Sequence, residues 1–531
     1  DERRAEPGVA CDDHQITVQQ HRQADAHGLP ADAGVARSLI PPGTAATRDF
    51  STLAPRIPAF AAERCVGCMS CVNACPDTAI LATAQPAAAL AERIGAFAAA
   101  SEAPDATATE LDGRFADTQK YGVVPARHGH APARFGIFVD PVHCKGCAEC
   151  VEVCHALGYD ALAMVDKQPA TDERPSTVEQ MRAQMDFFRS LPPTPSEYRN
   201  EKALADLMLG EHALGYVGGA GSCSGCGEAT ALRMLVAATR QVHGPESMGI
   251  VAATGCNSVY AATYPYNPYL VPWTNSLFEN APADALGIRA RWDQAGHADR
   301  RLWVIGGDGA MYDIGFQALS RMVAAGADIK VMVLDTQVYS NTGGQASTAS
   351  FGGQVTKLSH FGKVQHGRPE RRKELARILM AHGEVYVAQT TAAHVNHFYR
   401  AVIGANEFPG PAVVVVYTPC QPEHGIADDA SSAQSRLAVD SRAWPLLTYD
   451  PRRGSTIAER LSLQGNPALR QDWLQEPGGK LVDFVAFARS EGRFAAHFAN
   501  GAPSSEIIAT AADRLANWRQ LQEMAGISAG G

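Results

Sequence analysis

The second half of the chain alternates short apolar runs with longer stretches of helical periodicity. The apolar runs are continuous in Val, Ile, Leu and Met, which is typical of strands buried on both faces of a parallel sheet. Between the runs, apolar residues recur every three or four positions, as on one face of a helix. The expected strands are 248–253, 302–305, 330–334, 384–388 and 412–417, and the expected helices include 228–242, 313–325 and 395–408. This pattern predicts an α/β domain with a mainly parallel sheet.

The 531-residue chain is too long for this domain alone, since single domains hold about 100–200 residues. The first 60 residues are polar and interrupted by prolines, and a charged, proline-bearing stretch follows residue 166. We therefore expect five parts. They are an N-terminal arm at 1–60 that packs on the C-terminal domain, a small module at 61–165, a linker at 166–210, the α/β domain at 211–450 and a C-terminal helical extension at 451–531.

Composition narrows the kinds of partner and the compartment. A formal net charge of −10 argues against binding to nucleic acid. No apolar run reaches the roughly 18 residues of a membrane span, and we expect no signal peptide. Thirteen cysteines in a large chain without an export signal indicate metal binding in a reducing compartment. We therefore expect a cytoplasmic protein.

Eight of the cysteines form two runs with the same spacing. Each run reads Cys-x2-Cys-x2-Cys-x3-Cys, which is typical of bacterial ferredoxins, where the fourth cysteine of a run ligates the other cluster. Zinc is the alternative, but zinc sites rarely place four thiols in so short a run. The runs predict one [4Fe–4S] cluster on Cys65, Cys68, Cys71 and Cys154, and a second on Cys144, Cys147, Cys150 and Cys75.

Two polar loops follow neighbouring strands of the expected sheet. Asp308 follows the strand at 302–305, and Thr336 follows the strand at 330–334. Because parallel strands end on one rim, both loops should emerge together, where α/β folds bind ligands. Gly307 and Gly309 would let backbone N–H groups approach an anion, and the Asp and Thr oxygens suit Mg²⁺. The loops predict a Mg²⁺–diphosphate site, although a lone Gly-Asp-Gly is more often an ordinary turn.

Four further cysteines are dispersed along the second half of the chain. Cys223 and Cys226 lie in a glycine-rich loop before a helix, and Cys256 and Cys420 each follow an expected strand. If these strands are parallel, the four thiols gather on the rim that carries the two polar loops. A third [4Fe–4S] cluster is one interpretation; the other is that Cys256 and Cys420 are small buried hydrophobes.

Several motifs together resemble the pyruvate:ferredoxin oxidoreductase family. They are GSCSGCGE at 221–228, ATGC at 253–256, WTNSLFE at 273–279, GGDGAMYD at 306–313, DTQVYSNTGGQ at 335–345 and SRAWPLLTYD at 441–450. The likeness covers nearly the whole chain and corresponds to the ferredoxin-like and C-terminal thiamine-diphosphate parts of those enzymes. It implies a thiamine-diphosphate-binding α/β fold with a mainly parallel sheet, plus a small α+β ferredoxin-like 2[4Fe–4S] domain.

The resemblance also implies roles for individual residues. Mg²⁺ would be held by Asp308, the Thr336 hydroxyl and the Val338 carbonyl, and Asn341 would face the substrate as the catalytic residue. The implied cofactor-binding residues are Glu228, Cys256, Gly307, Asp308, Gly309, Ala310, Thr336, Gln337, Val338, Tyr339, Ser340 and Asn341. The implied ligands of a proximal [4Fe–4S] cluster are Cys223, Cys226, Cys256 and Cys420.

The activity implied by the resemblance is oxidative decarboxylation of a 2-oxo acid with thiamine diphosphate and Mg²⁺. The 339–345 loop resembles the pyruvate-using branch; the products would be acyl-CoA and CO₂, and three clusters would pass electrons to ferredoxin or flavodoxin. Alternatives are another 2-oxo acid, or an electron-transfer subunit with an inactive cofactor site. In the family the substrate- and coenzyme A-binding domains precede the matched part. We therefore expect a companion polypeptide and a hetero-oligomer, or a dimer of the complete enzyme.

Overall fold

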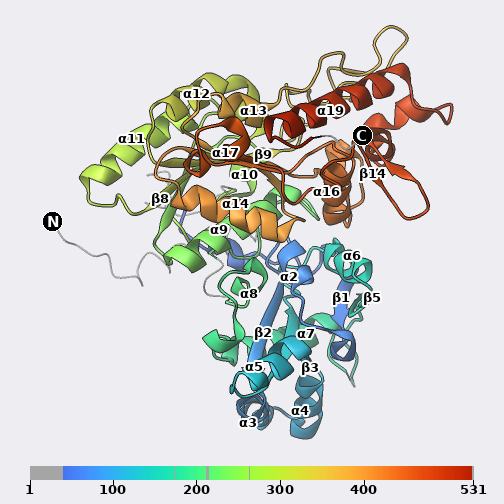
Figure 1. Ribbon diagram of the computed structural model, residues 1–531. Coiled ribbons are helices and arrows are strands. Elements are labelled where there is room, and N and C mark those ends of the chain that lie inside the picture. Colours follow the sequence, from blue (N-terminus) through green and yellow to red (C-terminus); the bar gives the residue numbers. More distant parts are fainter. Residues whose placement is uncertain (1–39, 173, 211–214, 262, 529–531) are drawn as a thin grey trace, which may run out of the picture.

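The computed structural model describes residues 40–172, 174–210, 215–261 and 263–528 of the protein. Figure 1 shows a large α/β body built around one sheet and a smaller body on one side of it. The smaller body contains the two cysteine runs, and the large body contains the sheet predicted for the second half of the chain. No helix among the described residues is long and apolar enough to cross a membrane.

Among the described residues, a sheet of eight strands forms the centre of the large body in the order β13-β12-β10-β11-β9-β8-β6-β7. The strands from β10 to β7 run parallel, and β12 and β13 extend one edge antiparallel. The sheet therefore confirms the predicted fold class. Its strands are β6 Met248–Ala253, β7 Trp273–Ser276, β8 Arg301–Gly307, β9 Ile329–Asp335, β10 Tyr386–Thr391, β11 Ala412–Tyr417, β12 Leu447–Tyr449 and β13 Leu461–Ser462.

Helices cover both faces of this sheet, and the apolar runs are unbroken for that reason. In β9, Met332 and Leu334 pack into one hydrophobic cluster, whereas Val331 and Val333 pack into another on the opposite face. The first cluster includes residues of α9 Gly227–His243 and α14 Val395–Glu407. The second includes residues of α11 Ala281–Gln294, α12 Phe316–Ala324, α13 Leu375–Met380 and α19 Ser505–Met524.

The smaller body holds two short sheets. In one, β1 Arg56–Phe60 pairs antiparallel with β5 Leu162–Asp166, and in the other β4 Ala133–Val139 lies between two neighbours. The neighbours of β4 are β2 Ile80–Pro86 and β3 Phe115–Asp117, and the helical segments are η3 Ala62–Arg64, α2 Ser70–Ala74, α3 Ala87–Ala98, α4 Pro104–Asp112, η4 Gln119–Val123, α5 Val124–Arg127 and α6 Glu149–Ala156. Helices α2 and α6 each carry cysteines of one run, so the duplicated sequence gives a duplicated structure.

The stretch expected to be a linker folds instead against the smaller body. Helix α7 Thr177–Ser190 begins at Ser176, whose side chain and that of Glu179 form a capping box. Phe187 is fully buried and its ring contacts that of Phe115 with centroids 6.4 Å apart. The charged composition that suggested a linker belongs to the exposed face of an amphipathic helix. Short segments η5 Ser196–Tyr198 and α8 Leu204–Leu207 follow before the large body begins.

The two ends of the described chain lie on the large body. The backbone N–H of Gly43 donates to Tyr269 at 2.9 Å and the Thr44 hydroxyl donates to Pro265 at the same distance, so residues near η2 Thr44–Thr47 lie on the large body. Residues 1–39 of the expected arm lie outside the described residues. The C-terminal part contains η8 Pro451–Arg453, α17 Ile457–Arg460, a hairpin of β14 Leu474–Gln475 with β15 Leu481–Val482, α18 Phe484–Arg489, η9 Gly492–Phe498 and α19.

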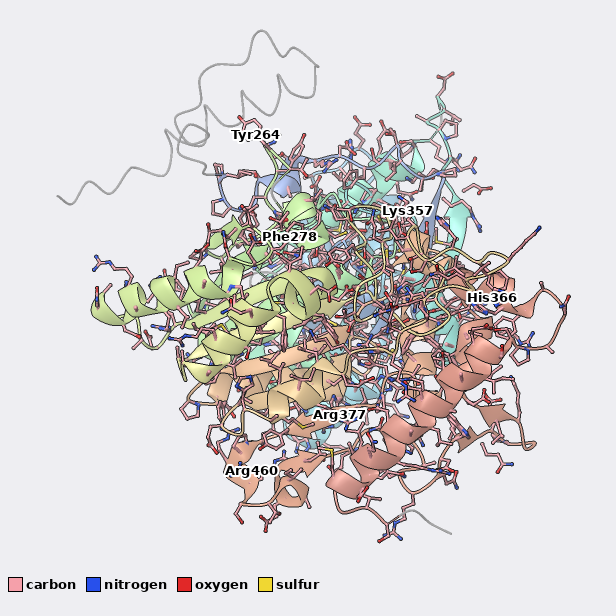
Figure 2. All side chains as sticks on the ribbon, turned by 90° about the horizontal axis from the view of Figure 1, so that it is seen from above. Tyr264, Phe278, Lys357, His366, Arg377 and Arg460 are labelled. Atoms are coloured by element: carbon pink, nitrogen blue, oxygen red, sulfur yellow. The ribbon has the colours of Figure 1, made fainter. Side chains whose placement is uncertain are left out.

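The C-terminal helix, α19, packs against the large body. Arg377 of α13, which Figure 2 labels beside α19, donates to Gln520 of α19 at 2.7 Å. Trp518 of α19 is fully buried in the second hydrophobic cluster. The expected helical extension is therefore packed into the core of the α/β body, with short strands as well as helices.

Candidate functional site

A cleft opens on the rim where the parallel strands of the large body end. Its walls come from the first turn of α9 and from the loops that follow β6, β7, β8 and β9. The lining residues are Glu228, Thr254, Gly255, Cys256, Phe278, Gly307, Asp308, Gly309, Ala310, Thr336, Val338, Tyr339, Ser340, Asn341 and Thr342. Phe278 (Figure 2) contributes an apolar side chain to a cleft that is lined by both polar and apolar groups. The structure thus gathers the residues of both predicted loops around one space.

Oxygen atoms from the two loops are packed closely inside this cleft. The Thr336 hydroxyl oxygen lies 3.1 Å from Asp308 Oδ1, 3.0 Å from the Val338 carbonyl oxygen and 2.5 Å from Ser340 Oγ. A single hydroxyl proton on Thr336 can satisfy only one of these acceptors at a time. A cluster with more oxygen lone pairs than protons is the donor set that a hard cation such as Mg²⁺ prefers. Asp308, Thr336 and Val338 therefore fit the ion.

The charge of Asp308 supports the same fit. Asp308 is only 1% exposed, and among the described residues no basic side chain forms an ion pair with it. Burial, followed by the nearby Asp335 carboxylate, raises the pKa of Asp308 well above its ordinary value. Asp335 itself is neutralised by Arg372, whose Nη2 lies 2.5 Å from Oδ2. Asp308 is thus the carboxylate in this pair that lacks a counter-charge, and a bound divalent cation would supply one.

Gly307 and Gly309 have different surroundings beside the cation site. A side chain at Gly309 would approach the ring of Tyr339 to 2.4 Å, so packing requires glycine there. At Gly307 a side chain would meet only the Leu334 carbonyl, at 3.8 Å, and would project into open space beside the cleft. Bare backbone at both positions suits the close approach of a diphosphate. Tyr339 is held in place because its hydroxyl donates to Asp313 at 3.1 Å.

Glu228 brings an unusual carboxyl group to the cleft. It lies in the first turn of α9, is 5% exposed, and its Oε2 has no hydrogen-bond partner among the described residues. Burial raises the pKa of Glu228 to about 8. A protonated carboxyl aimed into a cleft is suited to donate a hydrogen bond to a polar heterocycle. The residue therefore fits a role in holding the cofactor.

Two predicted residues stand apart from the others. Gln337 does not line the cleft; its side chain points into the protein, where its amide oxygen accepts a hydrogen bond from Arg493 Nη2 at 2.6 Å. Its backbone has φ of 61°, which turns the loop between Thr336 and Val338. Asn341 lies at the exposed mouth of the cleft. Gln337 thus supports the loop from behind, and Asn341 is the residue open to an incoming molecule.

The four dispersed cysteines are neighbours at the same rim. Cys226 immediately precedes α9, Cys256 begins α10 Cys256–Ala261, and Cys420 immediately precedes α15 Gln421–His424. Burial raises the pKa of Cys420 to about 12, and the thiol of Cys223 is among the neighbours that add to the rise. Burial likewise raises the pKa of Cys226 well above its ordinary value, with the thiols of Cys420 and Cys223 adding to it. The structure brings the four together beside the cleft, which Cys256 also lines.

The two cysteine runs of the smaller body interleave. Cys65, Cys68, Cys71 and Cys154 line one cavity between the runs. Burial raises the pKa of Cys144 to about 12, and the Cys75 thiol from the other run adds to it. The structure thus places Cys154 beside the first three thiols of the other run, and Cys75 beside Cys144.

The local backbone around the two runs is repeated as well. Gly67 and Gly146 both have φ of 72°, and Met69 and Ala148 have φ of 68° and 67°. Backbone N–H groups donate to the sulfur atoms, as from Ala79 to Cys75 at 3.3 Å. Such N–H···S bonds stabilise thiolates that bind clusters and set their potentials.

Within the described part of the chain, no three His, Cys, Asp or Glu side chains converge closely enough to hold a single ion. Four cysteines arranged around a cavity fit a larger inorganic group whose corners each take one thiolate. The donor sets therefore fit [4Fe–4S] clusters by their chemistry.

Two family models match the chain. Residues 253–416 match the model described as thiamine pyrophosphate enzyme, C-terminal TPP binding domain. Residues 58–81 match the model described as 4Fe-4S binding domain. The first match covers the sheet from the end of β6 into β11, with both loops of the cation site, and the second covers the first cysteine run.

Curated relatives match over most of the chain. A protein of Escherichia coli (strain K12) named "Probable pyruvate-flavodoxin oxidoreductase" is 31% identical over 505 residues, which is 83% of this chain and 40% of that protein. The pyruvate-flavodoxin oxidoreductase of Rhodospirillum rubrum is 27% identical over 556 residues, 90% of this chain and 42% of the relative. This chain is a homologue of the pyruvate-flavodoxin oxidoreductases. It spans about 40% of the length of these relatives.

A solved structure gives a weaker match. The 2-oxoglutarate:ferredoxin oxidoreductase of Magnetococcus marinus is 20% identical, with a TM-score of 0.36, and the match covers 58% of this chain and 88% of that one. This likeness is too low to carry an argument. The family models and the curated sequence relatives carry the homology, and they agree with the sequence-based prediction of a thiamine-diphosphate domain joined to a ferredoxin-like domain.

Several residues that support the cation site were not predicted from the sequence motifs. Ser347 donates a hydrogen bond to Asp308 Oδ2, and Thr348 donates to Asp313, which in turn holds Tyr339. Arg372 neutralises Asp335 directly beneath the cation site. These residues lie in an irregular segment between β9 and α13, where no hydrophobic period or spacing marks a partner. The motif DTQVYSNTGGQ ends just before them and was the nearest available signal.

Proposed function

We propose that this chain is the thiamine-diphosphate and iron–sulfur part of a 2-oxo acid oxidoreductase. The complete enzyme would convert the acid, with pyruvate preferred, to acyl-CoA and CO₂. One observation carries the proposal: Cys256 lines the cleft that contains the cation site and also has the thiols of Cys223, Cys226 and Cys420 as neighbours. A cleft for an electron-generating cofactor and a site for an electron-accepting cluster therefore share a wall.

Thiamine diphosphate, when bound, supplies an electron sink for the decarboxylation of a 2-oxo acid. The residues of this chain would hold it in the required orientation. Asp308, Thr336 and the Val338 carbonyl would bind Mg²⁺ against the diphosphate, while the bare backbone at Gly307 and Gly309 would cradle the phosphate oxygens. Asn341, at the mouth of the cleft, would face the substrate.

The three thiol sets give the electrons a route through the chain. Each set fits a [4Fe–4S] cluster, which carries one electron at a time. The set containing Cys256 lies at the cleft, the set containing Cys75 adjoins it through contacts at the junction of the two bodies, and the set containing Cys154 shares α2 and α6 with the second. We propose that electrons pass along this series to a soluble ferredoxin or flavodoxin.

Two alternatives remain distinct from this proposal. The same chemistry on another 2-oxo acid would use the same cation site and thiol sets, so only the substrate assay separates it. An electron-transfer subunit with an inactive cofactor site would not need the uncompensated Asp308 or the orphaned Glu228 carboxyl in the cleft. The presence of both groups favours an active cofactor site.

A companion polypeptide is part of the proposal. The chain spans about 40% of the length of its relatives, and the complete enzyme would add domains that bind substrate and coenzyme A, carried by a companion polypeptide. The working enzyme would be a hetero-oligomer, or a dimer of the complete enzyme. The twelve grouped thiols need a reducing setting, which supports a cytoplasmic location.

The direct test combines the chain with such a polypeptide. The complex should reduce a viologen dye only when a 2-oxo acid, coenzyme A, thiamine diphosphate and Mg²⁺ are all present, and the isolated chain should not. Comparing pyruvate with 2-oxoglutarate and with branched and aryl 2-oxo acids assigns the substrate. Turnover by the isolated chain, or dye reduction without thiamine diphosphate, would refute the proposal.

A further inference from the structure

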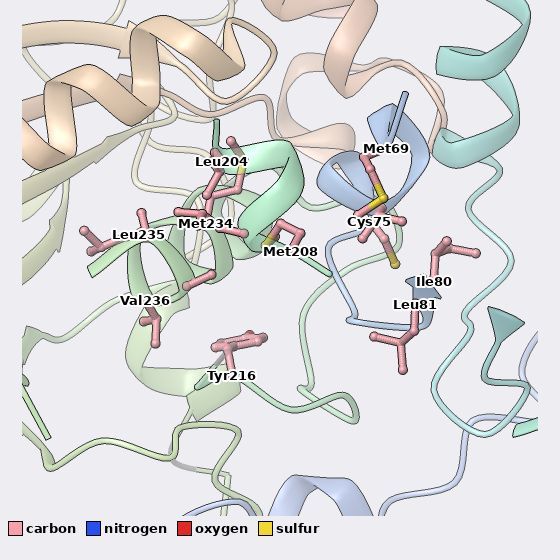
Figure 3. Packing of buried hydrophobic residues seen from close by; sticks show 14 of the residues in the cluster. Met69, Cys75, Ile80, Leu81, Leu204, Met208, Tyr216, Met234, Leu235 and Val236 are labelled. Carbon is pink, nitrogen blue, oxygen red and sulfur yellow. The ribbon is translucent and has the colours of Figure 1, made fainter. Parts of the chain in front are cut away.

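The junction between the two bodies is a continuous apolar core with two buried cations in it. Figure 3 shows Met234 and Leu235 of α9, in the large body, in the same packed cluster as Met69 and Cys75 of the smaller body. Arg233 belongs to the same stretch of α9 and is fully buried. Burying an arginine in an apolar junction is costly unless something nearby compensates its charge.

The hydrogen bonds of Arg233 lead to the first cysteine run. Its Nη1 donates to the carbonyl of Val72 at 2.5 Å and to the carbonyl of Cys75 at 2.9 Å, at the C-terminal end of α2. Its Nε and Nη2 have no hydrogen-bond partner among the described residues, and no carboxylate there forms an ion pair with it. Burial lowers the pKa of Arg233, whereas Cys75, followed by Asp77, favours its charged form. The guanidinium is therefore a buried cation, without an ion pair of its own, beside the thiol set that contains Cys75.

A second buried cation, Lys145, links the thiol set that contains Cys75 to the loop that carries Cys223. Cys223 belongs to the set of four thiols beside the cleft, here called the cleft-side set. Lys145 lies between Cys144 and Cys147, and its Nζ donates to the carbonyl of Ser222 at 2.7 Å. Ser222 immediately precedes Cys223. Lys145 differs from Arg233 in one respect, because it is paired with a buried carboxylate, Asp77 Oδ1, at 2.7 Å. Lys145 thus fixes geometry without leaving a net charge, whereas Arg233 leaves its charge unbalanced.

We propose that Arg233 is a positioning residue for electron transfer that both docks the Cys75 thiol set on α9 and raises the reduction potential of the cluster held there. α9 begins at the cleft-side thiol set, so one helix connects the donor site to the acceptor site. A cluster gains one negative charge on reduction, and a nearby cation in a low-dielectric interior stabilises the reduced form more than the oxidised one. Arginine stays protonated in proteins, so this effect does not vary with ordinary pH.

The step that Arg233 promotes is a one-electron transfer. The cleft-side cluster is oxidised by one electron and the Cys75 cluster is reduced by one, with no atom or proton transferred. Raising the potential of the acceptor makes this direction favourable and draws electrons away from the cleft. This inference rests on the proposed function only in requiring clusters at the two thiol sets.

The test measures the potential of the Cys75 cluster in the full chain by redox titration with EPR detection. Arg233→Gln keeps a hydrogen-bond donor for the α2 carbonyls and removes the charge; Arg233→Lys keeps the charge and loses the forked geometry. We expect Arg233→Gln to lower the equilibrium constant for one-electron reduction about tenfold, which equals a fall of about 59 mV. Arg233→Lys should stay near the wild-type value. The Cys154 set, which lies farther along the series, should shift less.

Arg240→Gln is the matched control, because Arg240 is on the same helix two turns later, is also buried, and, among the described residues, its side chain donates a hydrogen bond to the Pro245 carbonyl alone. It should leave all potentials unchanged. If Arg233→Gln binds full iron with an unshifted potential, the inference is wrong. If Arg233→Gln fails to bind iron, Arg233→Lys decides: a wild-type potential supports the role of the charge, and a tenfold fall overturns it. A wild-type chain without iron at these thiols would instead refute the proposed function.

Discussion

At the scale of single residues, the account depends most on Asp308. Three features of Asp308 act together: it is buried, it has no basic partner among the described residues, and Thr336 and Ser347 donate to its two oxygens. The neighbouring Asp335 differs from Asp308 in this respect, because Arg372 neutralises its charge. A carboxylate left without a counter-charge in such a place is stable in the folded protein when a cation binds it.

Asp308→Asn should therefore remove binding of Mg²⁺ and thiamine diphosphate. The amide keeps the shape of the side chain and loses the charge, so we expect cofactor affinity to fall at least about a hundredfold, since even outer partners of a metal contribute 10–100-fold. Equilibrium dialysis of the cofactor measures this, and iron content should not change. Asp284→Asn, on the exposed side of α11, is the control. Normal cofactor binding by Asp308→Asn would show that the carboxylate does not hold the ion.

The sequence allows the position of a residue to be predicted where a loop follows directly from a strand. Asp308 and Thr336 were found because each follows a recognisable buried strand, and parallel strands must end together. Ser347 and Arg372 were not found, because their segment has no period and their partners are distant in sequence. Gln337 was expected to bind the cofactor because of the family resemblance. Its backbone turn directs the side chain inward, and that turn has no signal in the residue type.

At the scale of elements, the C-terminal segment has a clear mechanical role. Arg493 of η9 donates to Gln337 behind the cation-site loop and pairs with the fully buried Glu491, whose Oε2 lies 2.6 Å from Arg493 Nε. His497 contacts the Gly353 carbonyl at 2.6 Å through its Nε2. The segment 491–497 therefore supports the polar loops from below. The sequence showed only helices and turns there, since the contacts join residues more than 140 positions apart.

Arg493→Met should destabilise the large body strongly. The change leaves Glu491 buried without its counter-charge, and breaking a buried pair in this way costs about 3–5 kcal/mol. Urea unfolding followed by circular dichroism measures the loss. Arg489→Met, in the exposed last turn of α18, is the matched control and should change stability by less than about 1 kcal/mol. Equal losses of stability from the two changes would show that the buried pair of Arg493 and Glu491 does not stabilise the large body.

Helix α14 gives the fold a pH dependence of known sign. Burial lowers the pKa of His397, near the start of α14, to about 4, whereas the unfolded chain has the ordinary value near 6.5. Between these values the unfolded state binds more protons, so stability falls as pH decreases from about 6.5 to about 4. His397→Gln should reduce the loss between pH 7 and pH 5 by about 2 kcal/mol, measured by urea unfolding. An unchanged pH dependence would show that His397 does not titrate in this way.

At the scale of the whole molecule, the smaller body and the large body share one hydrophobic core. The alternation of strands and helices predicted the large sheet, and the cysteine spacing predicted the interleaved thiol sets. The junction was not predicted. The stretch that forms α7 was interpreted as a linker because of its charged residues, which lie on the exposed face of that helix. Arg233 lies in α9, which is buried on all sides from Gly227 to Arg240, and nothing in the sequence marked it. Contacts between elements depend on three-dimensional packing, which local patterns do not contain.

The number of iron atoms held by the anaerobically reconstituted chain tests the central claim most directly. Three four-thiol sets, one of them sharing Cys256 with the cofactor cleft, predict about twelve iron atoms per chain and about eight in Cys420→Ala. Asp308→Asn should keep all twelve, because the cation site and the thiol set are separate. A wild-type chain with about eight iron atoms that Cys420→Ala leaves unchanged would contradict a cluster beside the cleft, and with it the oxidative function.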